Sequence, residues 1–310
     1  MLDVILARTK NFFIRIGRDF IKFVKTNPQY FLCSIIYYLI ASFLLGGVFF
    51  GFMFALLAYV ISLFIAFTPL GEKLLRFFEH VRKIETKKEK EYLLPLFHEV
   101  YRQAKQHSPE LGQIELCIID KITVSACALG KRTIAVTKGA IETFSPEELK
   151  ALMAHEIAHI VYGDSMARLY MTVGNGLFTA FVLVSKAFIF ISEIIEMIAS
   201  KNKITFAGVL ILLIKLLFLL AFYITQFLMK MVLSFSNRKS EFRADRYAYD
   251  LGYGEKLVEA FYLMEKMQLG NTTVIQKMTA DHPRITARIE RIELLLDQEH
   301  DMQSVPLPLA

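Results

Sequence analysis

Cysteine is scarce in this sequence, and the placement of the few cysteines argues against two common kinds of structure. Among 310 residues there are only Cys33, Cys117 and Cys127, without the paired spacing of a disulfide framework or of a thiolate metal site. Internal repeats and low-complexity linkers are also missing. A reducing compartment therefore fits the chain best.

Charge is missing from one long stretch, residues 30–70, which contains no Asp, Glu, Lys or Arg. A single helix of that length would measure roughly 60 Å, about twice the roughly 30 Å hydrocarbon core of a bilayer. The stretch must therefore fold back on itself, and Gly46, Gly47 and Gly51 offer the turn. We predict a first transmembrane hairpin over residues 30–70.

A second apolar block covers residues 169–235 and is less uniform than the first. Its best interpretation is a second transmembrane hairpin, with two spans separated by the polar residues 199–203. The alternative is a helical pair that is only partly embedded in the membrane. Charges inside a bilayer are costly unless they snorkel, pair or face a wet interior. This block carries Lys186, Glu193, Glu196 and Lys215.

Basic residues flank the first hairpin on both sides, and the chain has a net charge of +6. Residues 1–29 form a basic amphipathic segment that lacks the short apolar core and small-residue cleavage site of a signal peptide. The positive-inside rule places both flanks in the cytoplasm, which predicts a multi-pass protein of the cytoplasmic (inner) membrane. The Lys and Arg side chains would meet anionic lipid there, so the charge needs no nucleic-acid partner.

The remaining residues have the composition of a soluble domain in two parts, 71–168 and 236–298. A helical period over residues 91–106 precedes runs rich in Ile, Val and Thr. These runs read as three short strands, at 114–120, 121–130 and 132–141. We expect an α+β membrane protein, mostly helical, with four transmembrane helices as two hairpins and a cytoplasmic domain with a small three-stranded sheet. The tail, 299–310, is predicted to be disordered.

The sequence HEIAH at residues 155–159 lies where a well-delimited helix is predicted. Ser145 can cap the N-terminus of this helix, and Glu148 stands three residues later, as in a capping box. Gly163 occupies the position where a helix C-terminus favours a left-handed residue. The motif therefore belongs to a helix of about 17 residues rather than to a loop.

On that helix His155 and His159 share one face, about 6 Å apart along the axis, so both imidazoles can reach one zinc ion. Glu156 is positioned to take a proton from a water that the metal holds. The same five-residue pattern also occurs by chance in unrelated chains, but its place on a helix argues for a metal site.

A catalytic zinc site needs a third protein ligand, and the segment NRKSEFRADRYAYD at 237–250 offers one. Glu241 could bind the metal directly, while Asp245, four residues on, accepts a hydrogen bond from a ligating imidazole. The alternative is an exposed helix with ordinary charge pairs beside the membrane. Asp164 is expected to cap the following helix rather than to bind metal.

These motifs, followed by DHPRITARI at 281–289, make the chain resemble the HtpX family of membrane zinc metalloproteases of the gluzincin type. The resemblance implies an endopeptidase of the bacterial cytoplasmic membrane that acts on misfolded or damaged membrane proteins and unfolded polypeptides under stress. It further implies one Zn²⁺ per chain, with His155, His159 and Glu241 as ligands and Glu156 as catalytic base. Where relatives have an Asn-Ala-Phe-Ala type stretch, this chain has Ser125, Ala126, Cys127 and Ala128.

Zinc would polarise the scissile carbonyl and its bound water, and Glu156 would pass the water's proton to the leaving amine. The oxyanion needs a further donor, for which His282 and Arg288 are the candidates. His282 could instead cap a helix, and Arg288 could instead pair with a carboxylate that orders the domain. The small side chains of residues 125–128 suit a strand to whose edge an extended substrate adds through main-chain hydrogen bonds.

Two other functions are compatible with part of this pattern. A CAAX prenyl endopeptidase uses the same zinc chemistry, but its relatives have more spans than the four expected here. A membrane adaptor could use zinc only to hold helices together, but such a structural site has no use for a general base such as Glu156.

Overall fold

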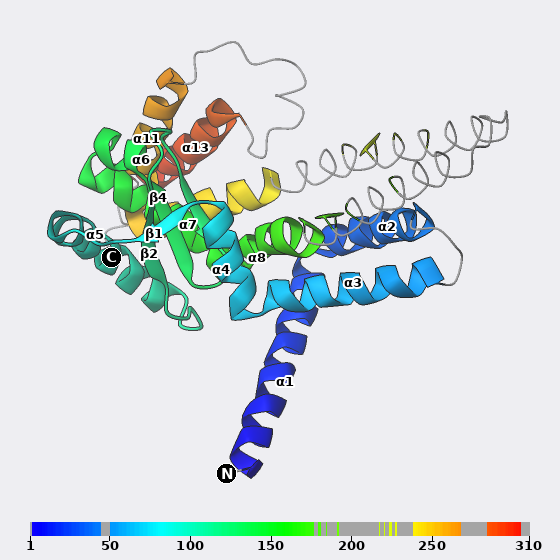
Figure 1. Cartoon of the computed structure of the whole chain (residues 1–310). Coiled ribbons are helices and arrows are strands. Elements are labelled where there is room, and N and C mark those ends of the chain that lie inside the picture. The colour runs from blue at the N-terminus through cyan, green and yellow to red at the C-terminus, as the bar shows by residue number, and fades with distance from the viewer. Residues whose placement is uncertain are drawn as a thin grey trace, which may run out of the picture. The chain divides into compact units, whose positions relative to one another are not determined.

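The computed structural model describes residues 2–44, 50–176, 238–267 and 284–304, together with isolated positions between 177 and 237. The chain forms two compact units (Figure 1). Unit 1 consists of Met1–Leu75 and Leu169–Leu233, and unit 2 consists of Arg76–Arg168 and Ser234–Ala310.

The described part of unit 1 is helical, with aromatic side chains at its centre. The hydroxyl groups of Tyr59 and Tyr170 lie 2.6 Å apart, and the ring of Phe23 is centred 4.6 Å from that of Tyr170. Helix α3 packs against α2 and against η1. The elements are α1 (Leu2–Thr26), α2 (Pro28–Leu44), α3 (Phe50–Phe67), most of α4 (Pro69–Phe78) and the π-helical η1 (Tyr170–Asn175).

Helices α2 and α3 occupy the first predicted hairpin. Gly51 was wrongly placed in its turn, because α3 already begins at Phe50, while Gly46 and Gly47 lie outside the described residues. Within the described residues no single helix is long and apolar enough to cross a membrane, but Leu56–Phe67 and Pro69–Phe78 together pass as a pair bent by 85°.

The second predicted hairpin, 169–235, falls almost entirely outside the described residues, and so does its turn at 199–203. The helix at its beginning is η1. The four transmembrane helices therefore stay a prediction.

Unit 2 contains a four-stranded sheet in the order β1-β2-β4-β3. The pair β2 and β4 is parallel, and the other two pairs are antiparallel. The prediction of three strands was wrong, because the first strand has only three residues, two of them basic, and so shows no apolar alternation. The strands are β1 (Val81–Lys83), β2 (Glu115–Ile119), β3 (Ala126–Leu129) and β4 (Thr133–Thr137).

The last predicted strand, 132–141, also ends earlier than expected. The side chain of Thr137 accepts a hydrogen bond from the backbone N–H of Ala140 and so caps the short helix α6 (Lys138–Thr143). Strand β4 therefore passes directly into a helix.

Helix α7 (Pro146–Tyr162) lies at the centre of unit 2 and carries the HEIAH motif. Both predicted caps are confirmed: Ser145 accepts from Glu148 N–H, and Gly163 has the left-handed φ of 83°. Helix α7 packs against β3, α5 (Lys87–His107) and α11 (Gly254–Met267), and residues 148–159 are all buried. The motif therefore sits in the core of the unit.

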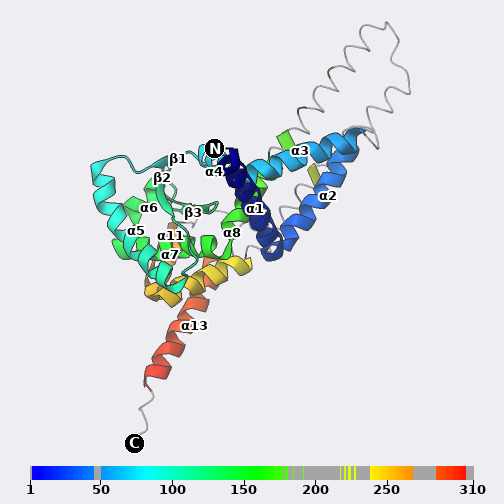
Figure 2. The same cartoon turned by 90° about the horizontal axis from the view of Figure 1, so that it is seen from below.

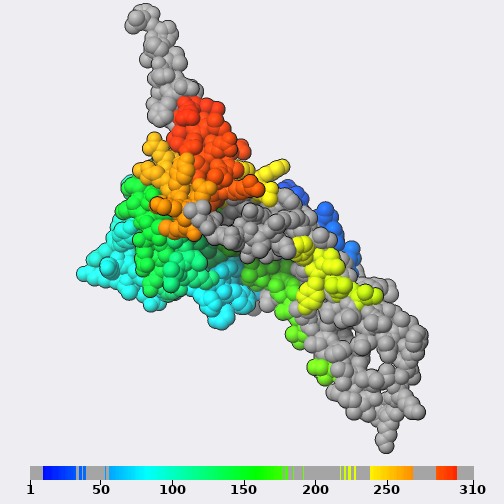
Figure 3. Space-filling view, turned by 90° about the horizontal axis from the view of Figure 1, so that it is seen from above, coloured from blue at the N-terminus to red at the C-terminus, as the bar shows by residue number. Residues whose placement is uncertain are grey.

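The C-terminal part of unit 2 packs against α7 through α11. Residues 238–248 are helical and run into the π-helical η2 (Tyr249–Tyr253), then α11, then α13 (Ile285–Ser304). Figure 3 shows α11, in orange, and α13, in red, side by side on the surface.

The predicted disorder of the tail was wrong for residues 299–304, which continue α13 (Figure 2). Their polar composition hid a helix that begins in the domain core, where Ile289 and Ile292 are buried. Residues 305–310 lie outside the described residues.

The loop between β2 and β3 is packed against the backbone of Gly139 in α6. A Cβ at Gly139 would lie 1.9 Å from the carbonyl oxygen of Ile122 and 2.8 Å from that of Thr123. Because both contacts are with backbone, we expect Gly139→Ala to lower the free energy of unfolding by about 1–3 kcal/mol. Thermal unfolding of the purified protein measures this loss.

Gly112→Ala is the matched control for that measurement. A Cβ at Gly112 would meet no heavy atom within 4 Å, so its effect should stay within about 0.5 kcal/mol. Equal melting temperatures for the two variants would show that the loop can move away from α6.

Candidate metal and catalytic site

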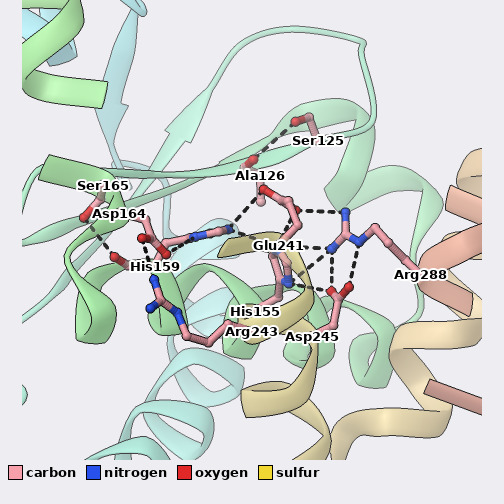
Figure 4. Close-up of polar contacts among 10 residues, drawn as sticks. All are labelled: Ser125, Ala126, His155, His159, Asp164, Ser165, Glu241, Arg243, Asp245 and Arg288. Carbon is pink, nitrogen blue, oxygen red and sulfur yellow. Dashed lines mark hydrogen bonds and ion pairs between the residues drawn. The ribbon is translucent and has the colours of Figure 1, made fainter. Parts of the chain in front are cut away.

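Three metal-ligating side chains converge in the core of unit 2 (Figure 4). Helix α7 brings the Nε2 atoms of His155 and His159 to within 3.2 Å of each other. Glu241, on the helix of residues 238–248, places its carboxylate oxygens 3.3 Å from Nε2 of His155 and 3.5 Å from Nε2 of His159. All three side chains are buried.

These distances fit a single zinc ion. Four ligands at bond lengths of about 2.0–2.1 Å in a tetrahedron lie roughly 3.3 Å from one another. The observed separations of 3.2, 3.3 and 3.5 Å match that value. Two imidazoles and one carboxylate also form the donor set of catalytic zinc sites, in which a fourth position stays open.

The outer nitrogen of each imidazole is held by a carboxylate. Nδ1 of His155 lies 3.0 Å from Asp245, and Nδ1 of His159 lies 3.2 Å from Asp164. A proton on each Nδ1 donates to the carboxylate and leaves the lone pair of Nε2 directed into the site. Asp245 is therefore placed as the sequence predicts, next to a ligating imidazole.

Asp164 is the site residue that the sequence analysis missed. It was expected to cap the next helix, but it is the first residue of α8 (Asp164–Leu169), and its carboxylate contacts His159 and Arg243. The left-handed turn at Gly163 ends α7 one residue earlier. That turn was the signal that could have revealed the contact, because it changes the direction of the chain immediately after the helix.

Arg243 links the two segments that carry the metal ligands. Its Nη2 donates to Asp164 at 2.8 Å, and its guanidinium lies 4.4 Å from the centre of the Tyr162 ring. A cation over an aromatic ring adds a modest attraction of about 0.5–1 kcal/mol at an exposed site. Arg243 therefore ties the helix of residues 238–248 to the C-terminal end of α7.

Arg288 is buried beside the ligands and faces two carboxylates (Figure 4). It forms a two-pronged ion pair with Asp245, at 2.8 and 2.5 Å, and a further one with Glu241 at 3.0 Å. Its guanidinium also lies 4.1 Å from the centre of the Phe261 ring. These contacts match the ion-pair alternative, and the role of Arg288 as an oxyanion donor stays a prediction. The other oxyanion candidate, His282, lies outside the described residues.

The electrostatics of the site favour a charged network. Burial and the charge of Arg288 would lower the pKa of His155, but hydrogen bonds to Asp245 and Glu241 outweigh them and raise it. Burial would also lower the pKa of His159, but its hydrogen bonds to Asp164 and Glu241 raise that pKa to about 10. Burial alone would raise the pKa of Asp245, but the charge and hydrogen bonds of Arg288 have the larger effect. The pKa is lowered, so this carboxylate is ionised. Zinc must displace the Nε2 proton of each charged imidazole, and zinc affinity is therefore expected to fall as the pH falls.

Strand β3 forms an edge of the sheet, and residues 125–128 lie at its beginning. Figure 4 shows Ser125 and Ala126 on the segment that runs past the ligands. The backbone N–H of Thr137 donates to the carbonyl oxygen of Ser125 at 3.0 Å. Because such pairs alternate along an antiparallel ladder, the main-chain groups of Ala126 and Ala128 point toward the outer edge.

Cys127 lies on this strand, and its thiol is not ionised. Burial raises its pKa to about 12, so the thiol stays protonated at neutral pH. Its main-chain groups face β4 through the pairing with Ala135.

Removing Asp164 should weaken zinc binding although Asp164 is not a ligand in this geometry. We expect Asp164→Ala to reduce zinc affinity by about 10–100-fold, because the imidazole of His159 loses its orienting partner. Competition with a chromogenic chelator measures the affinity, and Asp164→Asn, which keeps an acceptor, should lose less.

Arg246→Ala serves as the control for this comparison. Arg246 lies on the same helical segment as Arg243 but pairs with Asp250 at the surface. Equal zinc affinity for Asp164→Ala and Arg246→Ala would mean that His159 needs no outer partner.

The sequence that contains these residues is similar to the sequences of known proteins. The profile of Peptidase family M48 matches residues 87–295. Protease HtpX of Tolumonas auensis is 26% identical over 220 residues, 64% of this chain and 71% of the relative. Protease HtpX homolog of Bacillus subtilis is 27% identical over 263 residues, 78% of this chain and 81% of the relative. The solved structure of S. mikatae Ste24p has a TM-score of 0.49 and 17% identity, over 90% of this chain and 66% of that chain.

Proposed function

The chain belongs to peptidase family M48, within its HtpX metalloproteases, and we propose that it is a zinc-dependent endopeptidase that cleaves misfolded or damaged membrane proteins on the cytoplasmic side. One observation carries the proposal. The Nε2 atoms of His155 and His159 and the carboxylate of Glu241 converge at zinc-ligand separations, and α7, which carries both histidines, also carries Glu156.

Zinc held by these three ligands would act as a Lewis acid on the scissile carbonyl. Glu156, buried on α7 between the two histidines, takes the proton of the attacking water and delivers it to the leaving amine. Asp245 and Asp164 hold the Nδ1 protons of the histidines and so keep both rings oriented. Arg288 offsets the negative charge of Asp245 and Glu241, which would otherwise be buried next to each other.

An extended substrate would bind along the outer edge of β3. The main-chain groups of Ala126 and Ala128 alternate toward that edge, so a peptide strand can pair with them whatever its side chains are. The small side chains of this strand leave room for a bulky substrate residue. Such main-chain recognition suits a protease that must accept many unfolded polypeptides.

The membrane location rests on the exposed apolar surface of unit 1. Leucines in α2 and α3, such as Leu32, Leu39 and Leu57, present more than a third of their surface. An apolar surface of this kind is characteristic of a membrane or protein interface. The basic flanks of these helices support a cytoplasmic location for unit 2.

Removing the metal tests the proposed activity. We expect a chelator to abolish casein hydrolysis by the purified protein and stoichiometric Zn²⁺ to restore it, with one zinc per chain by metal analysis. A protein that binds zinc but never hydrolyses casein would be the adaptor, and one that hydrolyses casein equally well without metal would not be a metalloprotease.

A further inference from the structure

Helix α4 leaves α3 at a fixed angle close to a right angle. The two helices are bent by 85° at Thr68, whose hydroxyl donates to the carbonyl oxygen of Ile65 at 2.7 Å. Gly71 fits tightly into the bend, since a Cβ there would lie 2.6 Å from the same carbonyl oxygen. If α3 crosses a bilayer, a helix at this angle lies along the membrane surface.

The exposed side of α4 has the composition of a helix that lies in a membrane interface. Leu70, Lys73 and Phe77 are exposed at positions i, i+3 and i+7, which lie on one face, while Gly71 and Leu75 are buried. Phe77 is 75% exposed, and the neighbouring Phe78 packs edge-on against it. Exposed aromatic residues beside a lysine that can snorkel are typical of this environment.

A further apolar residue is exposed in the loop that follows β2. Ile122 is 91% exposed, although its loop is packed so tightly that a Cβ on Gly139 would meet its carbonyl oxygen at 1.9 Å. The pairing of Val81 with Ile119 brings the chain just after α4 next to the chain just before this loop. Lys121 adjoins Ile122 and is exposed.

From these observations we propose that Phe77, Phe78 and Ile122 of unit 2 form an interfacial surface that inserts into the headgroup region of an anionic bilayer. Lys121 meets the lipid phosphates beside it. A rigid loop that holds an isoleucine almost fully in water has no role in the core of unit 2. The proposal rests on the proposed membrane location of α3, and it predicts how unit 2 is held against the lipid.

The sequence contains no tryptophan, so single tryptophans can report on this surface without background. Ile122→Trp and Phe77→Trp would be placed in liposomes of phosphatidylcholine and phosphatidylglycerol that contain acyl-brominated lipid. We expect bromine to quench most of the emission of both variants. Leu57→Trp on α3, 57% exposed, reports the membrane itself, and Leu294→Trp on α13, 55% exposed, is the matched control that should keep its emission.

The four variants separate the possible failures. Quenching of Leu57→Trp without quenching of Ile122→Trp and Phe77→Trp would overturn the interfacial surface and leave the membrane location intact. No quenching of any variant would overturn both. Equal quenching of Leu294→Trp and Ile122→Trp would mean that the surface has no preference for lipid. Protection of Ile122→Trp from acrylamide by casein, without bromine quenching, would assign the loop to substrate and overturn the proposal.

Discussion

Glu156→Gln is expected to retain one zinc per chain and to lose casein hydrolysis by about 10²–10⁴-fold. Glutamine has nearly the same shape as glutamate but cannot accept the proton of the attacking water. The three ligands remain unchanged, because none of them depends on Glu156 for its position. Initial rates, metal analysis and thermal unfolding on the same preparation separate loss of chemistry from loss of structure.

Glu147→Gln is the control for this variant. Glu147 lies on the same helix, and its exposed side chain pairs with Lys150, which also pairs with Glu99. Near-normal hydrolysis by metal-loaded Glu156→Gln would refute the proposed catalytic role. Loss of activity in both variants would point instead to the stability of α7.

Glu241→Ala is expected to remove the metal itself. The loss of zinc affinity should exceed the roughly 10–100-fold expected for loss of an outer partner, because a ligand is missing rather than misoriented. Arg288 keeps its two-pronged pair with Asp245, so the fold should survive the substitution. Zinc retained during chelator competition measures the effect.

Glu259→Ala, which removes an exposed carboxylate of α11 paired with Lys256, provides the comparison. Zinc retention by Glu241→Ala equal to that of Glu259→Ala would place the third ligand elsewhere. His282 would then be the next candidate to substitute.

Local signals explain what could be predicted from the sequence. The limits of α7 depend on Ser145, Glu148 and Gly163, which act within a few residues of the chain. The i, i+4 spacing of His155 and His159 likewise needs only a helix to bring two nitrogens together. Such features depend on residues that are close in the sequence rather than on distant contacts, so the sequence predicts them well.

Features that depend on distant contacts were missed. Strand β1 exists because Val81–Lys83 pairs with β2, more than thirty residues later, and its own composition is basic rather than apolar. The role of Arg288 was left open between an oxyanion donor and an ion pair, because it meets Asp245 only after α13 has docked. No local pattern distinguishes these charged residues from those on the surface.

The order in which the ligands are synthesised has a consequence for the cell. A ribosome that has completed α7 has made two of the three metal ligands, but Glu241 and Asp245 follow some eighty residues later, and Arg288 later still. An unfinished or truncated chain that stops before Glu241 therefore holds both histidines and Asp164, but neither the third ligand nor Asp245. If the chain is the proposed protease, we expect a nascent chain to be inactive, because its set of metal ligands is complete only when nearly the whole chain has been synthesised.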